Sequence, residues 1–388
     1  MNGIRRAGLW CLTILLAACL LAYPICPAYA ADDFEEEIKM GKEAAEQVAK
    51  ESKFIDDPKL VERIEAIGKA IAKVAKEKEV RATYGKSTTA DFDYSFKILD
   101  DKYVNAFALP GGFVYVNKGL MDYVQSDDEL AGVIAHEITH VSHHHAVQLL
   151  KAQQKQMTML QLAVLVGAVA GAKTGDLGGL IQVMNLIRIA KLSSYGQDAE
   201  SDADRTAVAY LAETKHNPVG MLTFMERLAR DEIRKPQVDF GIFATHPPAH
   251  QRAREIIDEI EKRGIPINRR LVTTYTRVYI KPIPDSPASA VWIADTEIIR
   301  LADSGGETSA IRAERIAGKL SRLLLAGARL HDVKIGGGNQ YVVMMGEVLV
   351  APTQEDAALA GKSVAEVVTS AANAIKRSLL KEVLEQQY

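Results

Sequence analysis

The sequence predicts an α+β protein, with a mainly helical first domain that contains a small sheet and a smaller α+β domain after it. Apolar residues recur at helical spacing over most of residues 34–262, and strand-like alternation interrupts them only near residues 94–116. Strand and helix patterns alternate again after residue 271. Because the 388-residue chain is long enough for two cores, we expect domains at 31–268 and 269–388.

The first thirty residues have the pattern of an export signal. Arg5 and Arg6 precede an apolar run that is short for a bilayer span, Leu9 to Leu21, and Ala28-Tyr29-Ala30 forms a cleavage site. We therefore predict a signal peptide at 1–30 and a periplasmic mature protein. The alternative is a membrane-anchored lipoprotein, because the residues that end at Cys19 resemble a lipobox.

Composition limits the partners of the mature chain. All three cysteines precede Ala31, so the mature protein would be held by its core and by any bound metal, without disulfides. Removal of Arg5 and Arg6 with the signal changes the formal net charge from -3 to -5, so the mature chain has no excess of basic residues of the kind that binds nucleic acid. We expect no nucleic-acid partner.

The elements of the first domain follow from periodicity and turn residues. Two amphipathic helices are predicted between residues 34 and 78, separated at Asp56-Asp57-Pro58, where Pro58 suits a first helical turn. Residues 94–99 alternate as a strand, and residues 105–116 form a strand pair broken at Pro110-Gly111-Gly112. Further helices are predicted after Ser126 and at 197–214, 218–230 and 248–262.

An apolar stretch at residues 157–190 is interrupted near Gly171 to Asp176. Its longest uncharged run is shorter than the ~20 residues that cross a bilayer. We predict a helical hairpin that is buried or contacts the membrane surface or a partner, rather than a membrane span.

The second domain begins where the composition changes. Residues 271–280 alternate as a strand, and the proline-rich residues 281–287 read as a linker or rigid turn. Its glycine-rich turns lack the context of a phosphate-binding loop. Beyond the linker we predict strands at 291–294 and 297–302, a helix at 310–325, a hairpin at 329–350 and a helix at 363–384.

A His-Glu-x-x-His motif lies inside an apolar, helix-compatible run from Val133 to Val141. His136 and His140 are four residues apart, so on a helix they share one face and can bind the same metal ion. Glu137 is then placed to accept a proton from a metal-bound water. The motif indicates a zinc metalloprotease.

A catalytic zinc site needs a third protein ligand. Glu200 is the best candidate, because Glu200 and Asp204 share a face of a predicted helix, where one can bind zinc and the other can orient a ligand histidine. Asp198 and Asp202 lie off that face and are expected in solvent. The rival third ligand is His143 or His144, placed one turn beyond the motif.

Four ordered motifs give a family resemblance over about residues 35–255. They are Asn105 to Gly112, Glu129 to Val141, Glu200 to Asp204, and Thr245-His246-Pro247-Pro248 with Arg252. The chain resembles the zinc metallopeptidase family of the CAAX prenyl proteases, HtpX and Oma-type proteases, in its secreted bacterial, BepA-like branch. The resemblance implies a zincin fold of the gluzincin type and one zinc per chain, held by His136, His140 and Glu200.

The resemblance also implies supporting roles. Asp204 would hold the first histidine from behind. One segment is similar to the edge strand against which the family binds a substrate backbone. Its residues are Asn105, Ala106, Phe107, Ala108 and Leu109. His246 is similar to a histidine that, in some relatives, can fill the open zinc position. His246 would either fill that position and block the site or stabilise the oxyanion, and Arg252 is a second candidate for stabilising the oxyanion. The alternative is that His246 is an ordinary loop histidine.

The expected function is hydrolysis of peptide bonds in unfolded or misassembled envelope proteins, with Glu137 as general base. Its partners would be protein or peptide substrates and envelope-protein assembly factors. A different class stays open: a metal-bound chaperone or assembly factor whose zinc is plugged by His246. The 269–388 domain lies outside the resemblance and has no assigned role.

Overall fold

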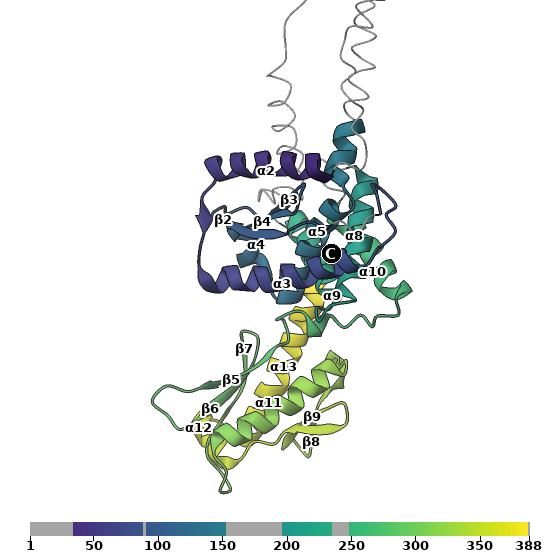
Figure 1. The fold of residues 1–388 in the computed structure, drawn as a ribbon. Helices are drawn as coiled ribbons and strands as arrows, with labels where there is room; N and C mark the ends of the chain where they lie inside the picture. Colours follow the sequence, from purple (N-terminus) through teal and green to yellow (C-terminus); the bar gives the residue numbers. More distant parts are fainter. Residues whose placement is uncertain (1–33, 88–90, 153–195, 235–247, 387–388) are drawn as a thin grey trace, which may run out of the picture.

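The computed structural model describes residues 34–87, 91–152, 196–234 and 248–386. Within these residues the chain is α+β with helices predominating, which confirms the predicted class (Figure 1). The predicted signal peptide, the apolar 157–190 segment and His246 lie outside the described residues. None of the helices in the described ranges is long and apolar enough to cross a membrane.

Two helices enclose the first sheet. Helix α2 (Phe34–Glu51) lies on one side of it and α3 (Pro58–Glu77) on the other (Figure 1). The predicted break is confirmed, since Pro58 starts α3 and the Asp57 carboxylate accepts hydrogen bonds from the backbone of the first turn, at 2.9 and 3.2 Å. The short strand β1 (Phe54–Ile55) between the helices was not predicted.

The first sheet has the strand order β1-β2-β4-β3. Strand β2 (Ser95–Leu99) is parallel to β4 (Phe113–Asn117), and the other pairs are antiparallel. Strand β3 (Ala106–Leu109) is therefore at the end of the sheet, and all four of its residues are buried. The tight turn from β3 to β4 needs Gly111 and Gly112, whose φ angles of 80° and 96° disfavour other residues.

Helix α5 (Asp127–Ser142) is the centre of the first core. It packs against β3 and α3 and against α8 (Gln197–Leu211) and α9 (Val219–Arg234). The short helix α4 (Lys118–Tyr123) precedes it in the chain, and α10 (Ala249–Lys262) packs on α8 and α9. As predicted, α5 begins after Ser126, whose Oγ accepts a hydrogen bond from Glu129 N at 3.2 Å.

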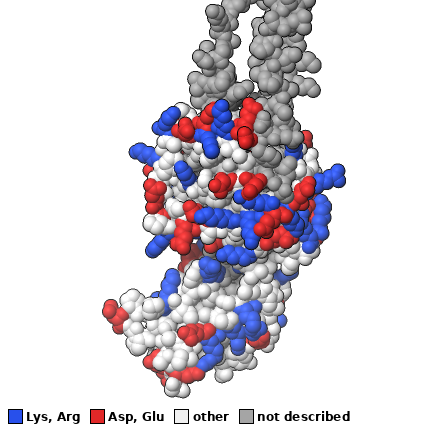
Figure 2. Space-filling view, in the orientation of Figure 1, with Lys and Arg blue, Asp and Glu red and all other residues white. Residues whose placement is uncertain are grey.

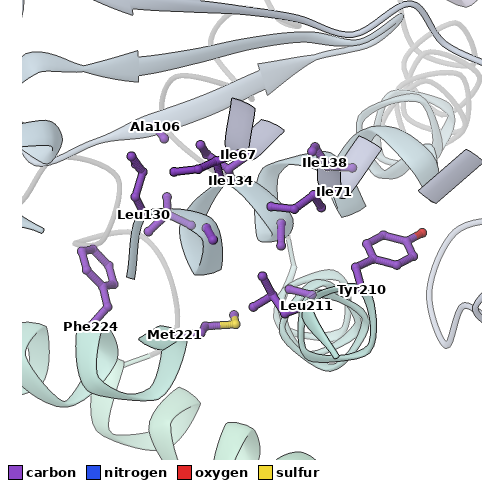
Figure 3. Packing of buried hydrophobic residues seen from close by; sticks show 14 of the residues in the cluster. Ile67, Ile71, Ala106, Leu130, Ile134, Ile138, Tyr210, Leu211, Met221 and Phe224 are labelled. Carbon is purple, nitrogen blue, oxygen red and sulfur yellow. The ribbon is translucent and has the colours of Figure 1, made fainter. Parts of the chain in front are cut away.

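Apolar side chains surround α5 (Figure 3). Ile134 and Ile138 are fully buried, and residues of α3, α8 and α9 meet them there: Ile67, Ile71, Tyr210, Leu211, Met221 and Phe224. The approach of α9 is close, because a Cβ on Gly132 would lie 2.8 Å from Met221 Cα. This packing makes α5 a rigid base for the residues that it presents.

The second core comprises apolar residues between Val291 and Leu379. One three-stranded sheet has the order β5-β6-β7 and the other β10-β9-β8. The elements are η2 (Arg269–Leu271), β5 (Val278–Pro282), β6 (Ser289–Ile293), β7 (Thr296–Leu301), α11 (Ser309–Leu325), η3 (Leu330–Asp332), β8 (Val333–Gly336), β9 (Tyr341–Met344), β10 (Glu347–Val350), α12 (Gln354–Ala360) and α13 (Val364–Gln386).

Three predictions for this part were wrong in whole or in part. The strand expected at 271–280 starts only at Val278, because residues 269–271 form a 3₁₀ turn. The linker or rigid turn expected at 281–287 is partly confirmed: a turn closed by a hydrogen bond between Ile283 and Ala288 joins β5 to β6, but Lys281 and Pro282 belong to strand β5. A proline is tolerated there because β5 is an edge strand. The hairpin expected at 329–350 is a three-stranded meander, and α12 was missed.

Helix α13 joins the two parts (Figure 1). Its last turns reach η2 and the first part, because Glu382 pairs with Arg270 of η2 at 2.7 Å and Glu385 pairs with Arg230 of α9 at 2.8 Å. The first core extends to Val272, so the border at 268/269 falls within this joint and stays a prediction. Lys and Arg side chains are interspersed with Asp and Glu over the face in Figure 2.

Candidate metal centre

Helix α5 brings the two motif histidines together. His136 and His140 are 4% and 3% exposed, and their Nε2 atoms lie 3.0 Å apart. Two nitrogens that each bind one zinc ion at ~2.0 Å in tetrahedral geometry are separated by about 3.3 Å, close to this distance. The helix therefore holds both imidazoles in an arrangement suited to one metal ion.

Helix α8 supplies the carboxylate that completes the cluster. Glu200 Oε2 lies 3.4 Å from His136 Nε2, and Glu200 Oε1 lies 3.6 Å from His140 Nε2. One ligand atom from each of the three residues falls within 4.8 Å of the others, and all three residues are buried. Two imidazole nitrogens and one carboxylate oxygen are the donor set of many catalytic zinc sites, so these residues fit the metal that the motif indicates.

Asp204 and Arg252 hold His136 from behind. Asp204 Oδ1 lies 2.8 Å from His136 Nδ1, while Arg252 donates from Nε to Oδ2 at 2.8 Å and from Nη2 to Oδ1 at 2.6 Å. Burial alone raises the pKa of Asp204, but Arg252 and His136 hold it below its usual value. The ionised Asp204 accepts the Nδ1 proton of His136, so Nε2, on the side of Glu200, is the nitrogen that can bind a metal ion once its own proton has left.

The partner of Arg252 is thus Asp204. Two of its three guanidinium nitrogens contact that carboxylate, and the third, Nη1, lies 3.8 Å from Glu200 Oε2. This geometry favours a positioning role for Arg252; its predicted contact with an oxyanion stays a prediction.

Glu137 lies beside the cluster and is 4% exposed. Burial raises its pKa to about 7, and Glu200 adds to the increase, whereas His136 and a hydrogen bond from the backbone of Ala108 oppose it. A carboxyl group that titrates near neutrality suits a general base, because it can both accept and release a proton. The contact with Ala108 also places the end strand β3 next to this carboxylate.

The histidine run after the motif does not lie where the rival third ligand would need it. Helix α5 ends at Ser142, and His144 has a left-handed φ of 57°, so the run does not continue the helix. His143 Nδ1 lies 2.5 Å from Asp202 Oδ2, and His144 Nδ1 lies 2.6 Å from Glu37 Oε2. Neither histidine belongs to the cluster that contains Glu200.

Asp202 was predicted to lie in solvent, and this was wrong. It is fully buried, whereas Asp198 is exposed as predicted. The reason is that α8 is covered on two sides: Thr83 donates to Asp202 from its backbone N at 2.5 Å and from Oγ1 at 2.8 Å. Sequence reasoning also missed His145, whose Nδ1 lies 2.9 Å from His140 Nδ1; its place in the run of three histidines after the motif was the only available signal.

Comparison with known proteins agrees with this geometry. The profile of Peptidase family M48 matches residues 63–260, about half of the chain. The chain belongs to peptidase family M48. The resemblance inferred from the four motifs is thereby confirmed.

Relatives of this M48 chain include three named proteases. It is 28% identical over 249 residues to the beta-barrel assembly-enhancing protease of Yersinia pestis, covering 64% of this chain and 48% of that protein. It is 31% identical over 174 residues to the metalloprotease LoiP of Escherichia coli K12, covering 44% and 64%, and 26% identical over 170 residues to the mitochondrial metalloendopeptidase OMA1 of Schizosaccharomyces pombe, covering 44% and 48%. The chain spans about half the length of the first relative.

Proposed function

We propose that this protein is a zinc-dependent endopeptidase in which His136, His140 and Glu200 hold one zinc ion. The observation that carries the proposal is the convergence of three buried ligand atoms beside Glu137. The metal, when bound, supplies a Lewis acid that acidifies water and polarises a carbonyl group. Asp204 and Arg252 fix the orientation of His136 and so pre-organise the site.

Glu137 moves the proton in this mechanism. Its carboxylate accepts a proton from the attacking water as the new C–O bond forms, and it returns the proton to the leaving amine nitrogen as the peptide C–N bond breaks. Burial of the site excludes bulk water and strengthens the electrostatic interactions inside it.

Strand β3 is the proposed substrate-binding element. It ends the sheet, it comprises Ala106 to Leu109, and the backbone of Ala108 contacts Glu137. An extended peptide that pairs with this edge would place its backbone against the general base, with Asn105 at the start of the strand. Because only an extended backbone can pair in this way, locally unfolded segments are the preferred substrates.

Unfolded or misassembled envelope proteins are the proposed substrate class. The name of one relative refers to enhancement of β-barrel assembly, and β-barrels of this kind belong to outer membranes. The export signal predicted at residues 1–30 agrees with a periplasmic location, and lipidation at Cys19 is the alternative. N-terminal sequencing of the secreted protein distinguishes them, since cleavage after Ala30 leaves Ala31 as the first residue.

An unfolded casein assay tests the proposal. Wild type should cleave casein and contain about one zinc per chain, whereas Glu137→Gln should retain the zinc and lose at least ~10²-fold in rate. Glu46→Gln is the matched control, because Glu46 is exposed on α2 and should cleave like wild type. Casein binding without cleavage by wild type would favour the chaperone alternative.

A further inference from the structure

A second histidine contact lies behind the proposed zinc site. His140 Nδ1 and His145 Nδ1 are 2.9 Å apart, and the two residues are 3% and 0% exposed. One nitrogen of this pair must carry the proton and the other must accept it. Which one carries it decides whether His140 Nε2 has a lone pair for a metal ion.

The surroundings of His145 decide the question. Its Nε2 lies 3.2 Å from Asp202 Oδ2 and 3.2 Å from the carbonyl oxygen of Tyr84. Because a carboxylate and a carbonyl only accept, Nε2 carries a proton. Neutral His145 then has its lone pair on Nδ1, so His140 donates from Nδ1 and keeps the lone pair of Nε2 on the side of Glu200.

Asp202 is itself firmly held. Its Oδ1 accepts two hydrogen bonds from Thr83, at 2.5 and 2.8 Å, and one from Arg205 Nη2 at 3.0 Å. Its Oδ2 contacts His143 Nδ1 at 2.5 Å as well as His145. Both oxygens of the carboxylate are therefore engaged, which fixes the position of His145.

His143, His145 and Asp202 also have ligand atoms within 4.8 Å of one another, as a metal site would. Two points favour support over a second metal. His145 uses its other nitrogen on His140, which ties it to the first site. The 2.5 Å between His143 Nδ1 and Asp202 Oδ2 is that of a direct, unusually short contact, and it is too short for two ligands of one tetrahedral ion, whose donor atoms lie about 3.3 Å apart.

We propose that His145, anchored by Asp202, is a positioning residue that fixes the tautomer and ring orientation of His140 for zinc binding. The inference rests on the proposed zinc site. In this arrangement a carboxylate supports the Nδ1 side of each ligand histidine. Asp204 contacts His136 directly, and Asp202 acts on His140 through the imidazole of His145. Both supporting carboxylates and the ligand Glu200 come from the single helix α8.

The test is zinc affinity, measured on the full chain by competition with a chelator, with zinc content determined first. His145→Leu removes the acceptor and should weaken zinc binding by ~10–100-fold. His145→Asn can place an amide oxygen near the position of Nδ1, so its affinity should be within a few-fold of wild type. His144→Asn is the matched control: His144 is a neighbouring buried histidine that pairs with Glu37, and asparagine tolerates its positive φ.

The outcomes separate the inference from the proposed function. A wild type that binds no zinc would overturn the zinc site itself. One zinc in wild type with unchanged affinity in His145→Leu would overturn only the role of His145. Equal losses of zinc affinity in His145→Leu and His145→Asn would indicate a purely structural role and would overturn the positioning role of His145. A second zinc equivalent in wild type that both His143→Ala and His145→Leu abolish would also overturn it. Thermal unfolding of the metal-free variants confirms that each is folded.

Discussion

Removal of the Asp204 carboxylate tests how the first ligand histidine is held. Asp204 is 1% exposed and accepts from His136 and from two nitrogens of Arg252, itself 2% exposed. Asp204→Ala takes away the acceptor for His136 Nδ1, so zinc affinity should fall by ~10–100-fold, or about 1.4–2.7 kcal/mol. It also leaves the Arg252 charge buried without its partner, which should destabilise the protein by about 3–5 kcal/mol.

The double variant Asp204→Ala/Arg252→Met separates the two effects. Methionine removes the buried charge, so much of the lost stability should return while zinc affinity stays low. Chelator competition gives the affinity, and urea unfolding of the metal-free proteins gives the stability. Asp204→Ala with wild-type zinc affinity would refute the positioning role, and an equally unstable double variant would refute the charge argument.

Four further predictions address other parts of the chain. Gly132→Ala should destabilise the protein by about 1–3 kcal/mol in urea unfolding, because the added Cβ would lie within 3 Å of α9 atoms. Asp356→Ala should cost about 3–5 kcal/mol but leave zinc content unchanged, because it breaks a buried pair with Arg312 at 2.6 Å in the second core. Burial lowers the pKa of His136, but Asp204 and Glu200 outweigh it and raise this pKa to about 9 in the metal-free protein. A proton must therefore leave His136 before the metal binds, so the affinity for zinc should rise with pH and level off above about 9. His246→Ala should raise casein cleavage if His246 plugs the site, or lower kcat ~10²–10³-fold with zinc intact if it binds the oxyanion; an unchanged rate contradicts both roles.

Local signals made the ligand helix predictable. Ser126 and the acidic first turn fixed the start of α5, and the spacing of the motif required both histidines on one face. The same four-residue rule related Glu200 to Asp204, and both side chains contact His136. These features depend on helix geometry alone, so a single sequence suffices to predict them.

The sequence could not predict which other polar side chains are buried. A helix-face argument assumes one buried face, but α8 is covered by α5 and also by the segment that contains Thr83 and Tyr84. Asp202 is nearly opposite Glu200 on the helix and is nevertheless enclosed. Only the tertiary arrangement of a segment 119 positions away reveals this cover.

The end of α5 explains how distant faces of α8 serve one site. Residue His144, with its φ of 57°, turns the chain out of the helix, and His145 then points back to His140. Had α5 continued, a residue five positions after His140 would lie about 140° around the helix axis, away from the ligand face. The left-handed turn thus brings the imidazole of His145 between His140 and Asp202, so that carboxylates on opposite sides of α8 each support one ligand histidine.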